Sequence, residues 1–168
     1  TVECIPSTIN LVCSVVVYGS GPTNADRLDG FTLTGGSGFF RDFGGGSPPN
    51  AIVGGGVLIF NSEPTITNNE IVNNLLANGT TNYFWGGGIY IAGGMYSDPI
   101  QPVISNNLIE GNIADSGPGQ NQNNTTYSTA GGLYAGIHTA PIISGNTIQY
   151  NRAGYAADNH QLAVGGGI

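Results

Sequence analysis

The chain has 168 residues, of which 39% are hydrophobic, so it is long enough to bury one continuous core. Only 8% of the residues are charged, lysine does not occur, and ten carboxylates against three arginines leave a net charge of −7. A nucleic-acid partner needs cations to neutralise its phosphates, so this class is excluded, and an anionic membrane surface is disfavoured for the same reason. No apolar run approaches the length of a membrane span, so we expect no membrane insertion.

Residues 1–25 are predicted to form an N-terminal strand or edge coil. The stretch 9–18 is apolar and rich in β-branched residues, which favours a strand, and it is too short to span a membrane. Cys4 and Cys13 lie close together in this region. We expect a disulfide between them in preference to two buried thiols, and hence an oxidising compartment.

Three segments farther along the chain align without gaps on the pattern Pro-x-Ile-x-(Asn/Gly)-Asn-x-Ile-x-x-Asn. These copies are residues 64–74, 102–112 and 141–151, and a more divergent copy is 26–36. Two apolar columns fix the alignment: Leu28, Ile66, Ile104 and Ile143 form the first, and Leu33, Ile71, Ile109 and Ile148 form the second. The repeat therefore has a period of 38, 38 and 39 residues.

Within one copy the two isoleucines are five residues apart with short alternating stretches around them, which indicates strand–bend–strand and not a helix. Asparagine and glycine occupy the bends because they accept left-handed backbone angles at low cost. Glycine clusters at 54–56, 86–88 and 131–132 precede the three clear copies and indicate tight bends before an apolar strand. Such a unit buries its apolar face only when copies stack about 4.8 Å apart.

Stacking in register superposes equivalent asparagines of successive copies. One column contains Asn69, Asn107 and Asn146, and the other contains Asn74, Asn112 and Asn151. A buried amide without a partner costs about 1–3 kcal/mol, whereas stacked amides satisfy each other along the axis. These six residues are therefore predicted to form structural ladders.

The sequence thus predicts an all-β fold, a right-handed parallel β-helix of about four to five coils in one domain, 1–168. Successive coils are expected at 26–53, 54–85, 86–130 and 131–164, with 165–168 starting a further coil. Between copies the chain varies in length at 75–85, 113–130 and 152–164. Variation at a constant place in the period predicts loops on one side of the solenoid.

These variable segments carry two kinds of candidate site. Asparagine-linked glycosylation sequons begin at Asn78, Asn123 and Asn124. The aromatic run Tyr83, Phe84 and Trp85 provides candidate glycan contacts, with the alternative that it only covers the side of the solenoid.

The glycine-cluster and Pro-x-Ile units together resemble the right-handed β-helix repeats of secreted and surface proteins of bacteria and archaea. Residues 14–21 followed by 28–36 resemble the first coils of that group. The resemblance covers nearly the whole chain and implies the pectate-lyase-like superfold. Proteins with such repeats include adhesins, polymorphic surface proteins and polysaccharide lyases, so the resemblance does not assign one function.

Polysaccharide-active members of this group use acids clustered on an outward sheet face. In the aligned outward columns no two carboxylates stack on adjacent coils, and the best remaining pair is the diagonal Glu70 and Glu110. A diagonal spacing of about 7–8 Å is compatible with an inverting glycosidase, but it is also usual on a solvated face. We therefore expect no enzyme activity, and these two residues are the only weak catalytic candidates.

A built metal site is not expected, because His138 and His160 stand far apart in the sequence. Calcium remains a candidate cofactor through three loop acids, Asp98, Asp115 and Asp158. The expected function is a non-catalytic structural or surface module, located extracellularly or at the cell surface. Two extensions stay open: a head-to-tail filament or homo-oligomer joined through the solenoid ends, and a glycan-binding or adhesin module.

Overall fold

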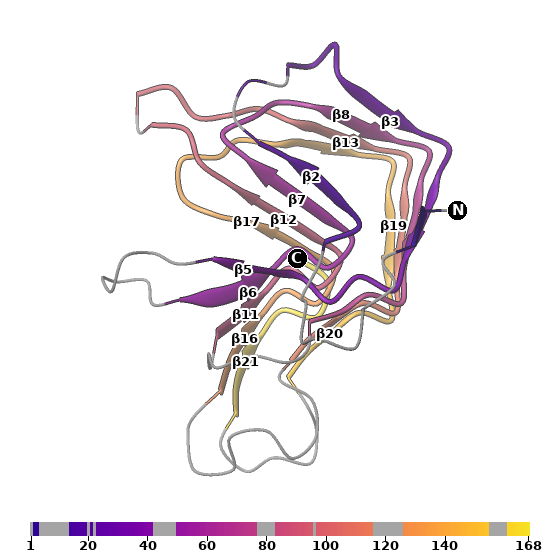
Figure 1. Ribbon diagram of the computed structural model, residues 1–168, viewed down its shortest axis with the longest axis vertical. Coiled ribbons are helices and arrows are strands. Elements are labelled where there is room, and N and C mark those ends of the chain that lie inside the picture. The colour runs from indigo at the N-terminus through magenta and orange to yellow at the C-terminus, as the bar shows by residue number, and fades with distance from the viewer. Residues whose placement is uncertain are drawn as a thin grey trace.

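The computed structural model describes residues 2–3, 14–19, 21, 23–41, 50–76, 83–95, 97–115, 126–154 and 161–168, and its elements are all β-strands. The strands stack from coil to coil in five sheets, which we label A to E (Figure 1). The prediction of an all-β parallel β-helix is confirmed, and the structure has about four coils, the lower number of the expected four to five. Within the described ranges, no helix has the length and apolarity needed to cross a membrane.

Each sheet takes its strands from successive coils. Sheet A contains β1 (Val2–Glu3), β4 (Thr32–Thr34), β9 (Glu70–Val72), β14 (Leu108–Glu110) and β19 (Thr147–Gln149). Sheet B contains β2 (Val16–Tyr18), β7 (Val57–Phe60), β12 (Ile89–Ala92) and β17 (Leu133–Ala135). Sheet C contains β3 (Arg27–Asp29), β8 (Thr65–Thr67), β13 (Val103–Ser105) and β18 (Ile142–Ser144). Sheet D contains β5 (Phe39–Arg41), β6 (Ala51–Val53), β11 (Tyr83–Trp85), β16 (Thr126–Thr129) and β21 (Gln161–Val164). Sheet E contains β10 (Leu75–Leu76), β15 (Ile113–Ala114) and β20 (Arg152–Ala153).

A complete coil passes through the sheets in the order B, C, A, E and D, and a glycine-rich bend then returns the chain to sheet B. The variable segments of the sequence join sheet E to sheet D at the same place in each coil, and their middle parts lie outside the described residues. All pairs of described strands are parallel except β5 and β6, which form an antiparallel pair in sheet D. This antiparallel pair was not predicted from the sequence.

The register between coils follows the two apolar columns of the repeat. Ile104 of β13 pairs with Ile66 of β8 and with Ile143 of β18, and Ile66 pairs in turn with Leu28 of β3. In sheet A the paired residues are Leu33, Ile71, Ile109 and Ile148. One repeat of the sequence is therefore one turn of the solenoid, as the alignment predicted.

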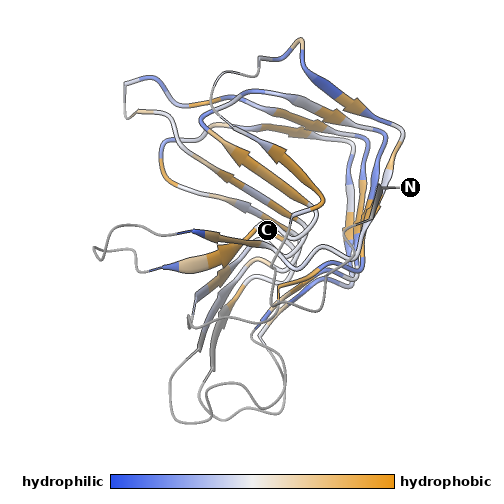
Figure 2. Ribbon diagram, viewed as in Figure 1, coloured by the Kyte–Doolittle hydropathy of each residue, from blue (hydrophilic) through white to orange (hydrophobic). Residues whose placement is uncertain are grey.

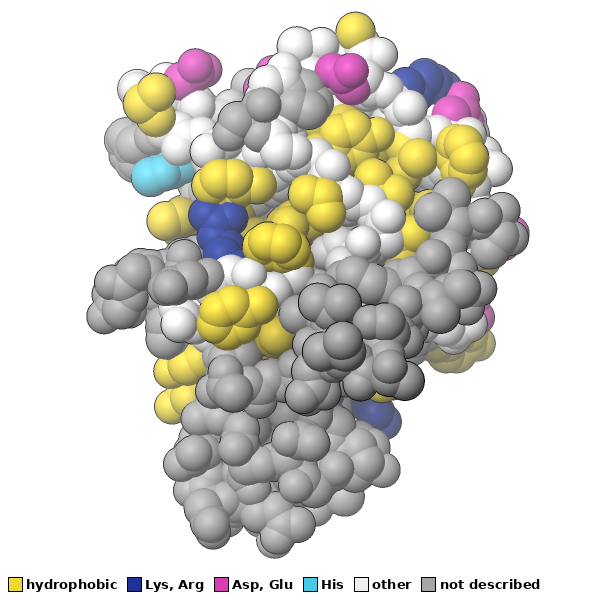
Figure 3. Space-filling view, viewed as in Figure 1, with side chains coloured by type: hydrophobic (Ala, Val, Ile, Leu, Met, Phe, Trp, Pro, Cys, Tyr) yellow, Lys and Arg dark blue, Asp and Glu magenta, His cyan; other side chains and the backbone are white. Residues whose placement is uncertain are grey.

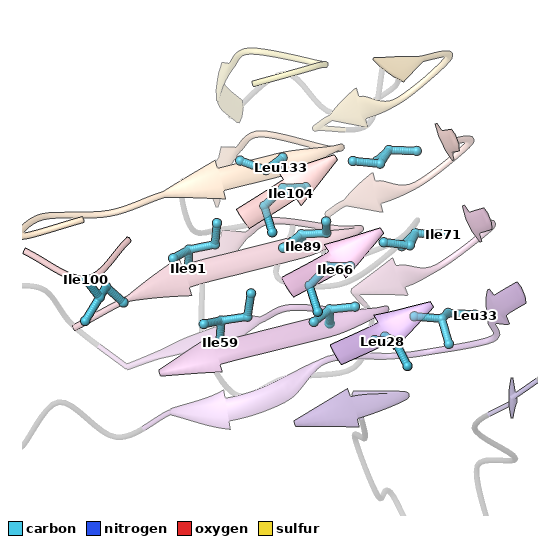
Figure 4. Close-up of a cluster of buried hydrophobic side chains, with 12 residues drawn as sticks. Leu28, Leu33, Ile59, Ile66, Ile71, Ile89, Ile91, Ile100, Ile104 and Leu133 are labelled. Carbon is cyan, nitrogen blue, oxygen red and sulfur yellow. The ribbon is translucent and has the colours of Figure 1, made fainter. Parts of the chain in front are cut away.

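The main core lies between sheets A, B and C. Its leucine, isoleucine and valine side chains stack in layers along the solenoid axis, and most have no exposed surface (Figure 4). In Figure 2, β2 and β7 of sheet B are coloured as strongly hydrophobic. A separate small core between sheets D and E contains Ile52, Leu76, Phe84 and Ala114.

The first asparagine ladder is confirmed. Asn107 Oδ1 accepts hydrogen bonds from the backbone N–H and from Nδ2 of Asn69, at 2.9 and 3.0 Å. Its own Nδ2 donates to the carbonyl oxygen of Ile66 and to Oδ1 of Asn146, both at 2.9 Å. Asn107 therefore binds the preceding coil through its amide oxygen and through the Ile66 carbonyl, and the following coil through Asn146, so little of its hydrogen-bonding capacity is left unused.

The second ladder, Asn74, Asn112 and Asn151, repeats this pattern at the corner between sheets A and E. Asn112 Oδ1 accepts from the N–H and Nδ2 of Asn74, and Asn151 Oδ1 accepts from those of Asn112. In the first coil the equivalent position is Gly36, whose backbone N–H donates to Oδ1 of Asn74 at 2.9 Å. Glycine therefore continues the ladder through its backbone.

The residues directly before the first-ladder asparagines take the left-handed backbone conformation. Asn68 and Asn106 have φ angles of 55° and 56°, and Gly30 and Gly145 occupy equivalent positions with 76° and 64°. In the Asn-Asn pairs the first residue therefore turns the chain, and the second directs its amide into the core.

The glycine clusters form the bend from sheet D back to sheet B, as predicted. A Cβ atom on Gly88 would lie 2.6 Å from the carbonyl oxygen of Gly132 and 3.0 Å from Nδ2 of Asn112. A side chain there would push neighbouring coils apart and disturb the second ladder. Glycine thus permits a bend tight enough for sheet D to fold back against the outer face of sheet B.

Candidate binding groove

Sheet D and the outer face of sheet B are lined by side chains that the alternation of β-strands directs away from the two cores. In β7, Ile59 enters the main core and Leu58 points to the opposite side. In β11, Phe84 enters the small D–E core, whereas Tyr83 and Trp85 pack with the outward side chains of sheet B. The outward faces of the two sheets therefore meet on the outside of the solenoid.

A cavity of about 480 Å³ lies between these faces. We call it the aromatic groove; its principal lining residues are Arg41, Phe60, Trp85, Tyr90, Tyr134 and His138. A volume of this size is within the range of cavities that hold small ligands.

The groove continues along the solenoid axis toward the first coil. A second cavity of about 350 Å³ shares Arg41 and Phe60 with it and is bordered by Val17, Phe39 and Phe40, which are all exposed. Figure 3 shows hydrophobic side chains gathered on this face of the molecule beside a dark-blue cation. The linings of the two cavities together include residues from four successive coils.

Three rings of the groove are nearly parallel. The ring centroids of Tyr90 and Tyr134 lie 5.2 Å apart with an interplanar angle of 4°, because the two residues pair directly in β12 and β17. Trp85 reaches them from sheet D, with centroids 5.8 Å from Tyr134 and 6.4 Å from Tyr90. Each such pair adds roughly 0.5–1.5 kcal/mol beyond burial, so the rings hold one another in place. Tyr90 is buried, whereas Trp85 and Tyr134 remain partly accessible.

The electrostatic character of the groove differs from that of the whole chain. The Arg41 guanidinium carbon lies 3.7 Å from the centre of the Phe60 ring, a cation–π contact. Burial lowers the pKa of Arg41, although an arginine stays charged at neutral pH. The described linings of both cavities contain no aspartate or glutamate, in a chain with ten carboxylates. The described lining of the groove is therefore mainly apolar and contains the Arg41 guanidinium, although the whole chain has a net charge of −7.

The tyrosines of the groove are uncharged at neutral pH. Burial raises the pKa of Tyr90 to about 12, and the positive charge of Arg41 opposes this effect only in part. Burial also raises the pKa of Tyr134. Both side chains therefore keep a phenolic O–H, which can donate and accept hydrogen bonds.

The predicted glycan contacts fall on two different faces of β11. Trp85 lines the groove, and Tyr83 lies beside it, stacked on Tyr127 at a centroid distance of 4.7 Å. Phe84 is fully buried in the D–E core and cannot contact a ligand.

Tyr90, Tyr134, Phe60 and Arg41 line the groove without having been predicted from the sequence. The alignment of the two tyrosines could have been predicted from the sequence, because each is the second residue after a glycine cluster. In the structure they occupy one outward column of sheet B.

The diagonal acids Glu70 and Glu110 lie on adjacent strands of sheet A in the predicted register, with Glu70 opposite Leu108. Glu70 Oε2 accepts a hydrogen bond from Thr32 Oγ1 at 3.2 Å, in the preceding coil. Glu110 Oε2 accepts one from Gln149 Nε2 at 3.0 Å, in the following coil. The two carboxylates thus bind partners on opposite sides of the pair along the solenoid axis.

Several predicted sites lie outside the described residues: Cys4, Cys13, Asn78, Asn123, Asn124 and Asp158. His160, at which no site was expected, also lies outside them. Of the calcium candidates within the described ranges, Asp98 is exposed on the segment between sheets B and C, whereas Asp115 is fully buried after β15. In the part of the chain that the structure describes, no three acidic, histidine or cysteine residues cluster as metal ligands would.

Comparisons with protein-family models, with curated proteins and with solved structures find no significant match to this chain. Its class is therefore defined by the fold and the groove: a parallel β-solenoid with internal asparagine ladders and an aromatic groove on its side.

Proposed function

We propose that the chain is a non-catalytic module of an extracellular or cell-surface protein and that it binds a saccharide in the aromatic groove. The observation that carries the proposal is a cavity of about 480 Å³ bordered by the near-parallel rings of Trp85, Tyr90 and Tyr134. A sugar ring offers an apolar C–H face for packing on aromatic rings and hydroxyl groups for hydrogen bonds. Ligand sites typically combine apolar walls with a few polar groups in this way.

Two observations support a non-catalytic role. Glu70 and Glu110 are each hydrogen-bonded to a side chain of a different coil, and they lie on sheet A, away from the groove in sheets B and D. The described groove linings contain no carboxylate that could serve as a general acid or base. Turnover of a polysaccharide that is abolished by Glu70→Gln or Glu110→Gln would contradict this part of the proposal.

The binding proposal is tested by screening the folded protein against a panel of neutral and acidic oligosaccharides, followed by calorimetric titration of those that bind. Trp85→Ala removes one wall of the groove and should weaken binding by roughly tenfold or more, since a well-placed contact contributes at least about 1.4 kcal/mol. Tyr150→Ala is the matched control, because this exposed tyrosine lies outside the groove lining and should leave affinity unchanged.

The proposal fails if no saccharide of the panel binds at millimolar concentration. It also fails if Trp85→Ala and Tyr150→Ala reduce affinity equally while circular dichroism shows both variants folded.

A second candidate function is head-to-tail assembly, and the burial pattern at β18 indicates which side chains such a contact would cover. Ile143 is 37% exposed and Ile142 is 52% exposed, although Ile104 in the same column as Ile143 has no exposed surface. A second copy whose first coil stacked there would cover these side chains, as would a further coil of the same chain.

Light scattering and electron microscopy of the 168-residue protein test this candidate. Assembly through the ends should produce filaments whose formation depends on concentration. A monomer that persists at high concentration without fibres would exclude it.

A further inference from the structure

We propose that the surface of the solenoid at β18 and β19 docks a β-coil of a partner chain, and that it selects a coil with asparagine at both ladder positions. We call this surface the end face; it consists of β18, Asn146, β19 and Asn151. The proposal goes beyond saccharide binding and does not depend on it. It concerns the surface that head-to-tail assembly would cover, but it names a different occupant.

The end face is apolar at its centre and has two open strand edges. β18 and β19 are the edge strands of sheets C and A, and each pairs with one described strand. Ile143 and Ile148 continue the two core columns and keep exposed surface, whereas Ile104 and Ile109 in the preceding coil have none. An edge strand offers backbone donors and acceptors to which a further strand can add. The surface therefore fits a strand–bend–strand segment with two apolar residues in the same columns.

The asparagine ladders give the end face a specific hydrogen-bonding requirement. The N–H and Nδ2 of each ladder asparagine donate to Oδ1 of the asparagine in the following coil, as Asn107 does to Asn146 and Asn112 does to Asn151. Nδ2 of Asn146 and of Asn151 donates to a backbone carbonyl oxygen of an earlier coil, at 2.7 and 2.8 Å. Within the described ranges no further ladder asparagine follows these two. Each therefore presents its backbone N–H and the second hydrogen of its amide at the end face.

A partner coil satisfies these donors when it brings an acceptor to each of the two ladder positions. Inside the protein this acceptor is the Oδ1 atom of an asparagine in both ladders. A buried donor without an acceptor is unfavourable, so a coil with an aliphatic residue at these positions should bind less tightly. The end face thus discriminates among β-coils by the chemistry of the ladder and not by the apolar columns alone.

The first coil of a second copy does not meet this requirement. Its ladder positions hold Phe31 and Gly36, which take part in the ladders as donors, through their backbone N–H groups to Oδ1 of Asn69 and of Asn74. Neither residue has a side-chain oxygen that could accept a hydrogen bond. In addition, β1 pairs with β4 at that end of sheet A. Two end faces do not complement each other either, because both present donors. The geometry therefore favours a coil from a different chain.

The test uses a synthetic peptide with the sequence of residues 102–112, which contains both apolar residues and both ladder asparagines. The labelled peptide should bind the 168-residue protein in a fluorescence anisotropy titration. The peptide with Asn107→Ala and Asn112→Ala should bind roughly 10- to 100-fold more weakly, because it lacks two acceptors. The peptide with Asn106→Gly is the matched control, since the equivalent position of the next coil is already Gly145. It should bind within about twofold of the original peptide.

Hydrogen exchange locates the binding surface without a protein variant. At a peptide concentration about ten times Kd, exchange of the backbone N–H groups of Asn146 and Asn151 should slow roughly tenfold, because only about one protein molecule in eleven is then free. Exchange of the backbone N–H groups of Trp85 and Tyr90, which line the aromatic groove, should not change.

Three outcomes would overturn the proposal. Equal affinity for the original and the doubly substituted peptide would contradict selection by the ladders. Absence of binding at millimolar concentration, or slower exchange at residues outside the end face, would remove the docking site. Filaments of the protein without added peptide would make a second copy the occupant, as in head-to-tail assembly. Saccharide binding in the aromatic groove would stand or fall separately, on its own titration.

Discussion

The two faces of sheet B have different chemical compositions. Ile59 and Ile91 point inward, have no exposed surface and pack against sheets A and C. Tyr90 and Tyr134 point outward and face sheet D across the aromatic groove. Each column takes one residue from every turn of the solenoid, and the outward column of Tyr90 and Tyr134 continues through Leu58 to Val17 in the first coil.

This difference indicates what each face contributes. Aliphatic side chains fill an enclosed space and carry no polar group that needs a partner, so the inner face contributes mainly to stability. Tyrosine and tryptophan combine a large apolar surface with a hydrogen-bonding group, which suits a surface that packs on one side and meets a hydrated ligand on the other. Substitutions on the inner face should therefore lower stability, and those on the outer face should chiefly alter binding or its response to pH.

The largest effect is expected for Ile104→Ala. Ile104 has no exposed surface and pairs with isoleucines of the coils on either side. Truncation leaves a cavity in the layered core and should lower the free energy of unfolding by about 2–5 kcal/mol, measured by denaturant titration.

Ile143→Ala sharpens this test, because Ile143 occupies the same column in the last coil and is 37% exposed. It should cost clearly less, since less surface returns to water. If the two substitutions lower the free energy of unfolding equally, the last coil must be covered by another molecule in solution. Sedimentation analysis of the wild type should then show self-association.

A smaller loss, about 1–3 kcal/mol, is expected for Asn107→Ala. The substitution removes the side-chain acceptor of the Asn69 N–H and one of the acceptors of Asn69 Nδ2, and it removes the amide that donates to the Ile66 carbonyl. Asn106→Gly is the control, because Asn106 is exposed and the equivalent position in the next coil is already a glycine, Gly145. An unchanged thermal unfolding transition for Asn107→Ala would contradict the stacked ladder.

The parts of the fold that the sequence predicted are those in which each residue repeats its environment every turn. The pattern Pro-x-Ile and the paired asparagines recur at 38 or 39 residues, so Ile66, Ile104 and Ile143 align without knowledge of the structure. Sheets C and A and both ladders follow from that alignment, and the glycine clusters place the bends.

The groove was harder to predict because it depends on contacts outside the aligned repeat. The chain between sheets E and D varies in length, so the aromatic run in β11 has no fixed register until its partner strands are known. Sequence alone therefore does not reveal that Phe84 points inward and that Trp85 points outward. Arg41 lies on an antiparallel strand that interrupts the regular coil, and nothing in the repeat predicts a cation at this place.

The smallest effect is expected on the outer face, from Tyr90→Phe. At neutral pH the phenylalanine ring can keep the stack on Tyr134, and stability should change by less than about 1 kcal/mol. The difference should emerge at alkaline pH, because burial raises the pKa of Tyr90 to about 12, whereas a tyrosine in the unfolded chain ionises near pH 10.

A pKa that is higher in the folded state means that the folded protein holds its proton more firmly than the unfolded chain does. The resulting stabilisation is fully present below about pH 10 and is lost as the pH rises through about 12. Denaturant titrations across this interval should show a steeper decline for the wild type than for Tyr90→Phe, while Tyr134 contributes a residual decline in both. Tyr150→Phe, which removes an exposed phenol, should leave the steeper decline in place. Parallel declines of the wild type and Tyr90→Phe would show that the Tyr90 phenol is solvated in the folded protein, and the groove would then be more open than its packed rings indicate.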